Sequence, residues 1–160
     1  SGKSTLAKAI GSALDLPVVH MDALFWQAGW VERDEISFQR LTAAAAEQDS
    51  WVIDGNYSRT MAPRLERVDT IVYLDMSHWL RMSRVLKRRI VFHGKTRPDL
   101  GEDCAERMDW AFFMWCWEYE RKRAPAQREK VKAWSKEKSV VHLKSRRDVR
   151  RFLATLKETT

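Results

Sequence analysis

Short apolar runs alternate along the chain with longer stretches in which apolar residues recur every three or four positions. The short runs cover residues 17–21, 51–53, 70–74 and 140–143, and their β-branched side chains predict strands. The periodic stretches predict helices that begin near residues 5, 35, 61, 78, 108, 125 and 146. Strands that alternate with helices are typical of right-handed βαβ crossovers. The pattern therefore predicts a single α/β domain over residues 1–160, a three-layer α/β/α doubly wound parallel sheet.

Several local signals fix where the predicted helices begin. Asp34 and Ser77 precede helical stretches and are expected to cap them, and Pro125 suits the first turn of another helix. Ser145, with Asp148 three residues later, resembles a capping box. In the helix after Ser77, we expect residues 82, 86 and 90 to lie on one apolar side.

Composition narrows the class of protein. Ten Gly and Pro residues in 160 exclude collagen-like and low-complexity chains. No apolar run approaches the roughly 18 residues of a membrane span, and the first residues do not have the pattern of a secretory signal. We therefore expect a cytoplasmic protein without a membrane partner. Cys104 and Cys116 lack a partner at metal-binding spacing and are interpreted as small core residues.

Three of the predicted strands lead into a carboxylate, namely Asp22, Asp54 and Asp75. The carboxyl ends of parallel strands meet at one edge of a sheet, and ligands of such sheets collect there. The sequence thus predicts a site at this edge. His20 lies in the first strand and is interpreted as a core residue, with a pocket residue as the alternative. Most of the eight tryptophans are also assigned to the core, but Trp26 and Trp30 could stack on a base.

Positive charge is concentrated in three segments. Residues 81–97 hold seven basic and no acidic side chains, and further basic excesses occur in 121–138 and 144–151. Together these excesses are larger than the net charge of +7, so the rest of the chain is net acidic. A localised anion site or a nucleic-acid surface is indicated, with solvated helix faces as the alternative. Arginines and lysines around a Gly/Pro-containing loop favour a lid insertion at about residues 90–125 that closes over phosphates.

The chain opens on Ser1, Gly2, Lys3, Ser4 and Thr5. Gly-Lys-Ser matches the end of the phosphate-loop pattern G-x-x-x-x-G-K-[ST], in which backbone N–H groups surround phosphates, the lysine reaches the β and γ oxygens and the hydroxyl binds Mg²⁺. The tripeptide also occurs by chance, in which case Lys3 is a surface residue. The amphipathic helix that follows it and the strand-end acids favour a phosphate loop. We expect the first strand and the start of that loop to precede Ser1.

These motifs together resemble the adenylate kinase group of P-loop kinases. The resemblance combines Ser-Gly-Lys-Ser-Thr, Asp54-Gly55 with Arg59 after it, and Arg84-x-x-x-Arg88-Arg89 before a loop. More narrowly, residues 16–26, 51–57, 95–99 and 107–110 resemble the bacterial DNA topology modulation proteins, a branch of that group. The resemblance spans almost the whole chain. It implies a nucleoside-monophosphate-kinase-like fold, ATP and Mg²⁺ as cofactors, and a lid.

The resemblance also implies roles for individual residues. It assigns nucleotide contacts to Ser1, Gly2, Lys3, Ser4, Thr5, Arg84, Arg88 and Arg89, and Mg²⁺ contacts to Ser4 and Asp54. Acceptor contacts fall to Asp22, Asn56, Tyr57, Arg59 and Arg97, and catalytic roles to Lys3, Asp22, Asp54 and Arg88. Adenylate kinases place the acceptor arginine four residues after the Asp, whereas Arg59 is five after Asp54. Asp22 instead resembles the acceptor-binding acid of shikimate kinase, so the acceptor stays open.

The resulting hypothesis is a small-molecule phosphotransferase that moves the γ-phosphoryl group of ATP to an unidentified acceptor, acting as a monomer or homodimer. Loose transition states of this kind are stabilised by positioning and by cations, which the arginines supply. The alternative is an ATP-dependent nucleic-acid-binding protein without small-molecule kinase activity. Three basic segments motivate it, but no helix-turn-helix, zinc-finger or RRM pattern is present. The expected partners are therefore a nucleotide and a small acceptor, and nucleic acid is the less favoured alternative.

Overall fold

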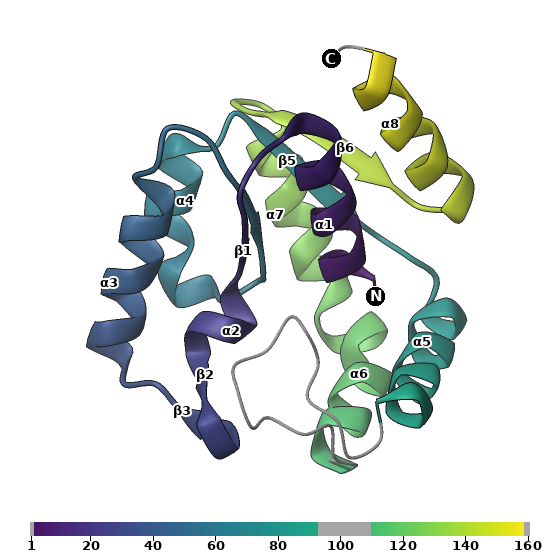
Figure 1. Cartoon of the computed structure of the whole chain (residues 1–160). Helices are drawn as coiled ribbons and strands as arrows, with labels where there is room; N and C mark the ends of the chain where they lie inside the picture. The colour runs from purple at the N-terminus through teal and green to yellow at the C-terminus, as the bar shows by residue number, and fades with distance from the viewer. Residues whose placement is uncertain (1, 93–109, 159–160) are drawn as a thin grey trace.

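A computed structural model describes residues 2–92 and 110–158 of the chain (Figure 1). Its elements are α1 (Lys3–Leu14), β1 (Val18–His20), α2 (Met21–Phe25), β2 (Trp26–Gln27), η1 (Ala28–Trp30), β3 (Val31–Glu32), α3 (Glu35–Ala46), β4 (Val52–Asp54), η2 (Ser58–Thr60), α4 (Met61–Arg67), β5 (Thr70–Leu74), α5 (His78–Val91), α6 (Trp110–Lys122), α7 (Ala124–Trp134), β6 (Ser139–Leu143) and α8 (Arg146–Glu158). The α/β class expected from the sequence is confirmed. Among the described residues, no helix is long and apolar enough to cross a membrane.

The strands pair in twos. β1 runs parallel to β4, with His20 opposite Asp54, and β5 runs parallel to β6, with Leu74 opposite Leu143. β2 and β3 form a two-residue antiparallel ribbon. The parallel crossovers predicted from the sequence are therefore present. The described strands form three separate two-stranded sheets, however, instead of the single doubly wound sheet that the pattern predicted.

Helix α1 joins the two parallel pairs through the main core. Leu6 and Ile10 of α1 are buried together with Leu143 of β6. Partly buried apolar side chains from both strand pairs and from α8 pack against this cluster: Val52, Val72, Leu74, Val141, Val149, Phe152, Leu153 and Leu156. The apolar stripe predicted for the last helix thus packs on the core. In Figure 1, α1 lies in front of the strands, with α8 beside it.

Predicted helix starts are borne out by their hydrogen bonds. The backbone N–H of Ser37 donates to Asp34 Oδ1 at 2.8 Å, and Ser77 Oγ accepts from the N–H of Leu80 at 3.4 Å. At the start of α8, the N–H of Ser145 donates to Asp148 Oδ2 at 2.8 Å, and the N–H of Asp148 donates to Ser145 Oγ at 3.1 Å. This reciprocal pair is the capping box that the sequence predicts.

The apolar side of α5 is only partly buried. Met82 is buried, but Leu86 is 46% exposed and Ile90 is 78% exposed. At 100° per residue, positions 82, 86 and 90 lie within about 80° of one another, on one side of the helix as expected. Helix α5 packs against α6. Only Met82 of the three is covered.

Candidate active site

The start of α1 and the carboxyl ends of β1, β4 and β5 lie on the same side of the molecule (Figure 1). From that side, β1 leads into α2, and β5 leads toward α5, which packs against α6. Helices α1, α2 and α5 therefore begin near the strand-end site that the sequence predicts.

Gly2 forms the start of α1 in a conformation that only glycine adopts easily. It caps the helix at φ 96°, and its carbonyl accepts from the N–H of Leu6 at 3.0 Å. A Cβ built on Gly2 would lie 2.5 Å from Nη1 of Arg84 and 3.3 Å from its Cζ. The guanidinium of α5 thus occupies the space beside the main chain of Gly2. Sequence reasoning predicted both residues for one site, and the structure brings them together.

Further positive charge surrounds this point. Burial lowers the pKa of Arg84, and the nearby charge of Arg146, at the start of α8, lowers it further. Burial raises the pKa of the Cys116 thiol, while the positive charges of Arg88 and Lys3 act in the opposite direction. Lys3 of α1 and Arg88 of α5 thus both act on Cys116, and Arg84 of α5 lies beside Gly2. Arg146 was missed, because nothing in the sequence links the start of the last helix to the first residues.

The other residues predicted at the nucleotide are placed unevenly. Ser4 is half-buried and Thr5 is exposed in the first turn of α1. Arg89 belongs to α5, and its side chain lies outside what the structure describes. Ser1 and Arg97, together with most of the predicted lid insertion, also lie outside the described residues.

Asp54 is a buried carboxylate at the end of β4. The parallel register places His20 directly opposite, and His20 Nδ1 lies 3.3 Å from Asp54 Oδ2. Their side chains are only 11% and 9% exposed. His20 is thus largely shielded from water, and it contacts a predicted catalytic acid. Gly55 then turns the chain at φ 144°, where a Cβ would lie 2.7 Å from Cγ of Met21.

Asp22 lies in the first turn of α2 and contacts Tyr57. The Tyr57 hydroxyl donates to Asp22 Oδ1 at 2.7 Å. Burial raises the pKa of Tyr57 strongly, and the negative charges of Asp22, Glu32 and Asp54 raise it further. Asp22 thus contacts the phenol, and the charges of Glu32 and Asp54 also act on it. Two residues predicted at the acceptor, Asp22 and Tyr57, are in direct contact.

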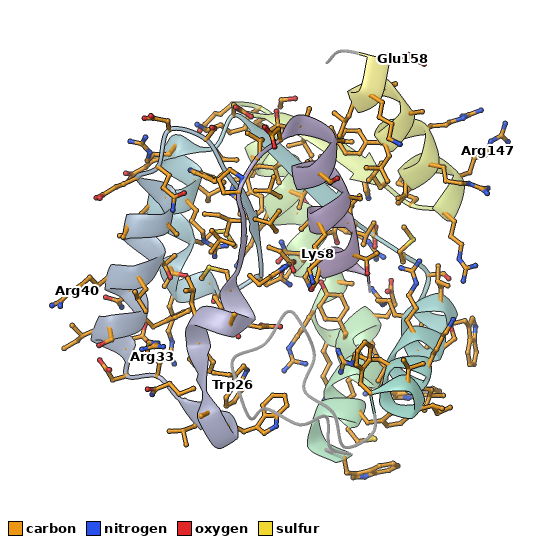
Figure 2. All side chains as sticks on the ribbon, in the orientation of Figure 1. Lys8, Trp26, Arg33, Arg40, Arg147 and Glu158 are labelled. Carbon is orange, nitrogen blue, oxygen red and sulfur yellow. The ribbon has the colours of Figure 1, made fainter. Side chains whose placement is uncertain are left out.

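Aromatic rings enclose the phenol of Tyr57. The Tyr57 ring lies 5.1 Å from Phe25 and 5.0 Å from Phe38 between centroids, and Phe25 contacts Trp26 edge-on at 4.9 Å. Trp26 in turn lies 5.3 Å from Trp30. Figure 2 shows Trp26 below α2. The two tryptophans singled out in the sequence are thus continuous with the Asp22–Tyr57 pair.

Arg64 holds the turn that carries Tyr57, and sequence reasoning missed it. It is 6% exposed, and its guanidinium donates to the carbonyls of Thr60 at 3.1 Å, Gly55 at 2.9 Å and Tyr57 at 2.9 Å. Burial lowers its pKa, since the carbonyl partners carry only partial charge. A faint signal exists: Arg64 lies four residues after Thr60, on the same helix face.

Arg59 and Asn56 do not join the predicted acceptor group. The side chain of Arg59 is 81% exposed, and its Nη1 lies 3.1 Å from Glu35 Oε2 on α3. Asn56 is exposed in the turn after β4. Glu35 begins α3 and attracts the arginine away from Asp54, so the acceptor contact expected for Arg59 from the resemblance is not formed here.

Asp75, the third strand-end acid, is neutralised within the protein. Arg128 of α7 donates to its two oxygens at 2.9 and 3.0 Å, and His142 Nε2 lies 3.2 Å from Oδ2. Burial opposes ionisation, but these hydrogen bonds bring the pKa of Asp75 below its usual value. Arg128 also binds Glu120 at 2.6 Å, and Glu120 contacts Arg81 of α5. This network ties α5, α6 and α7 to the end of β5.

The donors available to a metal are few. Within residues 2–92 and 110–158, no group of three or more His, Cys, Asp or Glu side chains is arranged to hold a metal ion. Ser4 and Asp54 are the two oxygen donors expected from the sequence. Mg²⁺ commonly takes one or two protein ligands and completes its shell with phosphate oxygens and water, so this donor set suits a nucleotide-bound ion.

Comparison of the chain with protein-family models, curated proteins and solved structures gives no match.

Proposed function

We propose that the protein is an ATP-dependent phosphotransferase that acts on a small acceptor. The observation that carries the proposal is the left-handed Gly2 at the start of α1 with the Arg84 guanidinium beside its main chain. The N–H groups of a first helical turn lack intrahelical acceptors and favour anions. Lys3, in the first turn of α1, and Arg88, one turn after Arg84 on α5, add positive charge on the same two helices. An anion with several oxygens, such as a polyphosphate, fits these donors.

The proposed roles of the residues follow from their positions. Lys3, Arg84 and Arg88 neutralise the phosphates and orient the γ-phosphoryl group, the charge of which spreads over its oxygens during transfer. Ser4 and Asp54 would hold the ion, and Mg²⁺ supplies charge neutralisation of the phosphates when bound. Asp22 accepts the proton of the acceptor hydroxyl, and Tyr57 orients Asp22 through the 2.7 Å hydrogen bond. His20 fixes Asp54.

The proposed fold is the three-layer sheet of P-loop kinases. Strands of both parallel pairs carry side chains of the α1 core, namely Val52 of β4, Val72 and Leu74 of β5, and Val141 and Leu143 of β6. A single sheet that holds both pairs beneath α1 would account for this shared packing.

The decisive assay is release of ADP from MgATP, with Lys3→Met compared to Lys8→Met. Both lysines are exposed on α1, but only Lys3 lies in the first turn. We expect Lys3→Met to lower turnover at least 100-fold, which is the order expected when a transition-state charge loses its partner. The matched variant should keep the wild-type rate. Equal rates for all three proteins would reject the assignment.

A specific surface supports the alternative of nucleic-acid binding. Trp79 of α5 is 73% exposed and Trp117 of α6 is 45% exposed, and their ring centroids are 6.2 Å apart. Exposed basic residues on the same two helices, Lys87 and Arg121, add positive charge. Exposed rings beside cations are typical of single-strand binding. If this function holds, an oligonucleotide binds at low salt, loses affinity steeply as salt rises, and fails to bind the Trp79→Ala variant.

A further inference from the structure

The acceptor side of the molecule offers an anion no lysine, and its described arginines are engaged elsewhere or lie on the outside. Residues 17–76 contain five arginines and no lysine. Three of the arginines donate to backbone carbonyls: Arg33 to Leu24 at 2.6 Å, Arg64 to three carbonyls around Tyr57, and Arg67 to Glu47 at 3.4 Å. The other two, Arg59 and Arg40, lie on the outside. Arg59 pairs with Glu35, and Figure 2 shows Arg40 pointing outward from α3.

Negative charge faces the same place. The carboxylates of Asp22, Glu32 and Asp54 all act on the Tyr57 phenol and raise its pKa. Asp54 is 9% exposed, so water screens its charge poorly. A phosphate or carboxylate brought beside Tyr57 would meet the Asp22 carboxylate directly and would be repelled by the charges that act on the phenol. A hydroxyl group would find an acceptor, and an ammonium group would find a counter-ion.

Aromatic side chains beside Asp22 also determine which ligands the site can bind. Phe25, Trp26 and Tyr57 form a chain of edge-on and tilted contacts that begins at the Asp22–Tyr57 pair. Aromatic surfaces bind flat uncharged rings by stacking and bind cations through their π-faces. Neither interaction attracts an anion. Charge and ring chemistry therefore select the same kind of molecule.

We infer that the acceptor is a hydroxyl compound that carries no negative charge, such as a nucleoside or an amino alcohol, and is not a nucleoside monophosphate. This inference rests on the proposed phosphotransferase function. In the reaction, the acceptor oxygen forms a bond to the γ-phosphorus of ATP while the bond from that phosphorus to the bridging oxygen breaks. ADP leaves with that oxygen, and the acceptor proton passes to the Asp22 carboxylate. The atoms and charges balance without a further reactant.

Matched pairs of probes test the inference. The pairs are adenosine with AMP and ethanolamine with phosphoethanolamine. The two members of each pair differ by one phosphate group. The first pair tests a neutral acceptor, and the second tests a cationic acceptor. ADP release is measured at saturating MgATP. We expect one uncharged or cationic member to raise the rate at least 10-fold above its phosphorylated partner. Equal or faster turnover with a phosphorylated member, or stimulation by none of the four probes, overturns the inference.

Two further measurements separate this inference from the function on which it rests. MgATP binding is measured by calorimetry on the same protein: no binding rejects the phosphotransferase itself, whereas binding with preference for AMP rejects only the acceptor class. Glu32→Lys then changes the charge that faces Tyr57 from an exposed position. For a cationic acceptor KM should rise severalfold with kcat little changed. For a neutral acceptor, KM should stay constant, while turnover with its phosphorylated partner improves. A fall in kcat without either of these two results contradicts the inference.

Discussion

Replacement of Arg64 by Ala is expected to destabilise the protein by about 3 kcal/mol. The side chain is 6% exposed and makes three hydrogen bonds of 2.9–3.1 Å to the carbonyls of Thr60, Gly55 and Tyr57. Hydrogen bonds that involve a charged group contribute about 1.5–3 kcal/mol each, so the gross loss is larger. Part of it is offset because the variant no longer buries a guanidinium, which itself costs several kcal/mol. A net loss near 3 kcal/mol remains.

Urea unfolding followed by tryptophan fluorescence measures this difference, and Arg67→Ala is the matched control. Arg67 lies on the same helix but is exposed and makes one hydrogen bond of 3.4 Å to the Glu47 carbonyl. The control should change the free energy of unfolding by less than about 0.5 kcal/mol. For Arg64→Ala, Tm should fall by roughly 6–12 °C. If the Arg64 variant matches the control, the guanidinium does not hold the turn that carries Tyr57.

Two other substitutions test the packing around the site. Asp75→Asn should cost about 1.5–3 kcal/mol at pH 7, because the carboxylate loses charge-assisted bonds from Arg128 and His142. The lowered pKa of Asp75 means that its contribution is complete above the usual value of 3.8 and is lost as the pH falls through the folded value. The stabilities of wild type and variant should therefore converge as the pH falls below the usual value, and a constant gap would be contrary evidence. Gly11→Ala normally stabilises a helix by about 1 kcal/mol. Here the new Cβ meets Val18 and lies 2.9 Å from the Leu16 carbonyl, so a lower Tm is expected and a higher one would show that the helix can shift.

Local sequence signals predicted the longer elements. Helix α4 begins at the predicted residue 61, and the caps of α3, α5 and α8 are made by the predicted residues. Such features depend on residues three or four positions apart, so a single segment determines them. The short β-branched runs likewise predicted the strands of the two parallel pairs, whereas the ribbon of β2 and β3 was not predicted. The partner of each strand depends on the rest of the chain, and the predicted single sheet was only partly found.

Contacts between residues far apart in the chain could not be predicted from the sequence. The bidentate pair of Arg128 with Asp75 spans 53 positions, and the contact of His142 with Asp75 spans 67. No periodicity connects such residues. Asp75 was therefore grouped with Asp22 and Asp54, although it is neutralised inside the protein. Arg59 shows the opposite case, in which the motif placed it at the site but Glu35 holds it elsewhere.

Binding of MgATP, measured by calorimetry on Gly2→Ala and Gly29→Ala, tests the central claim most directly. Both glycines have positive φ, 96° and 75°, so an added Cβ strains the backbone similarly in each. They differ in what the Cβ meets: Arg84 lies 2.5 Å away at Gly2, and nothing lies within 4 Å at Gly29. We predict wild-type affinity for Gly29→Ala and at least a 10-fold loss for Gly2→Ala. Tight binding by both variants would contradict a phosphate site at the start of α1.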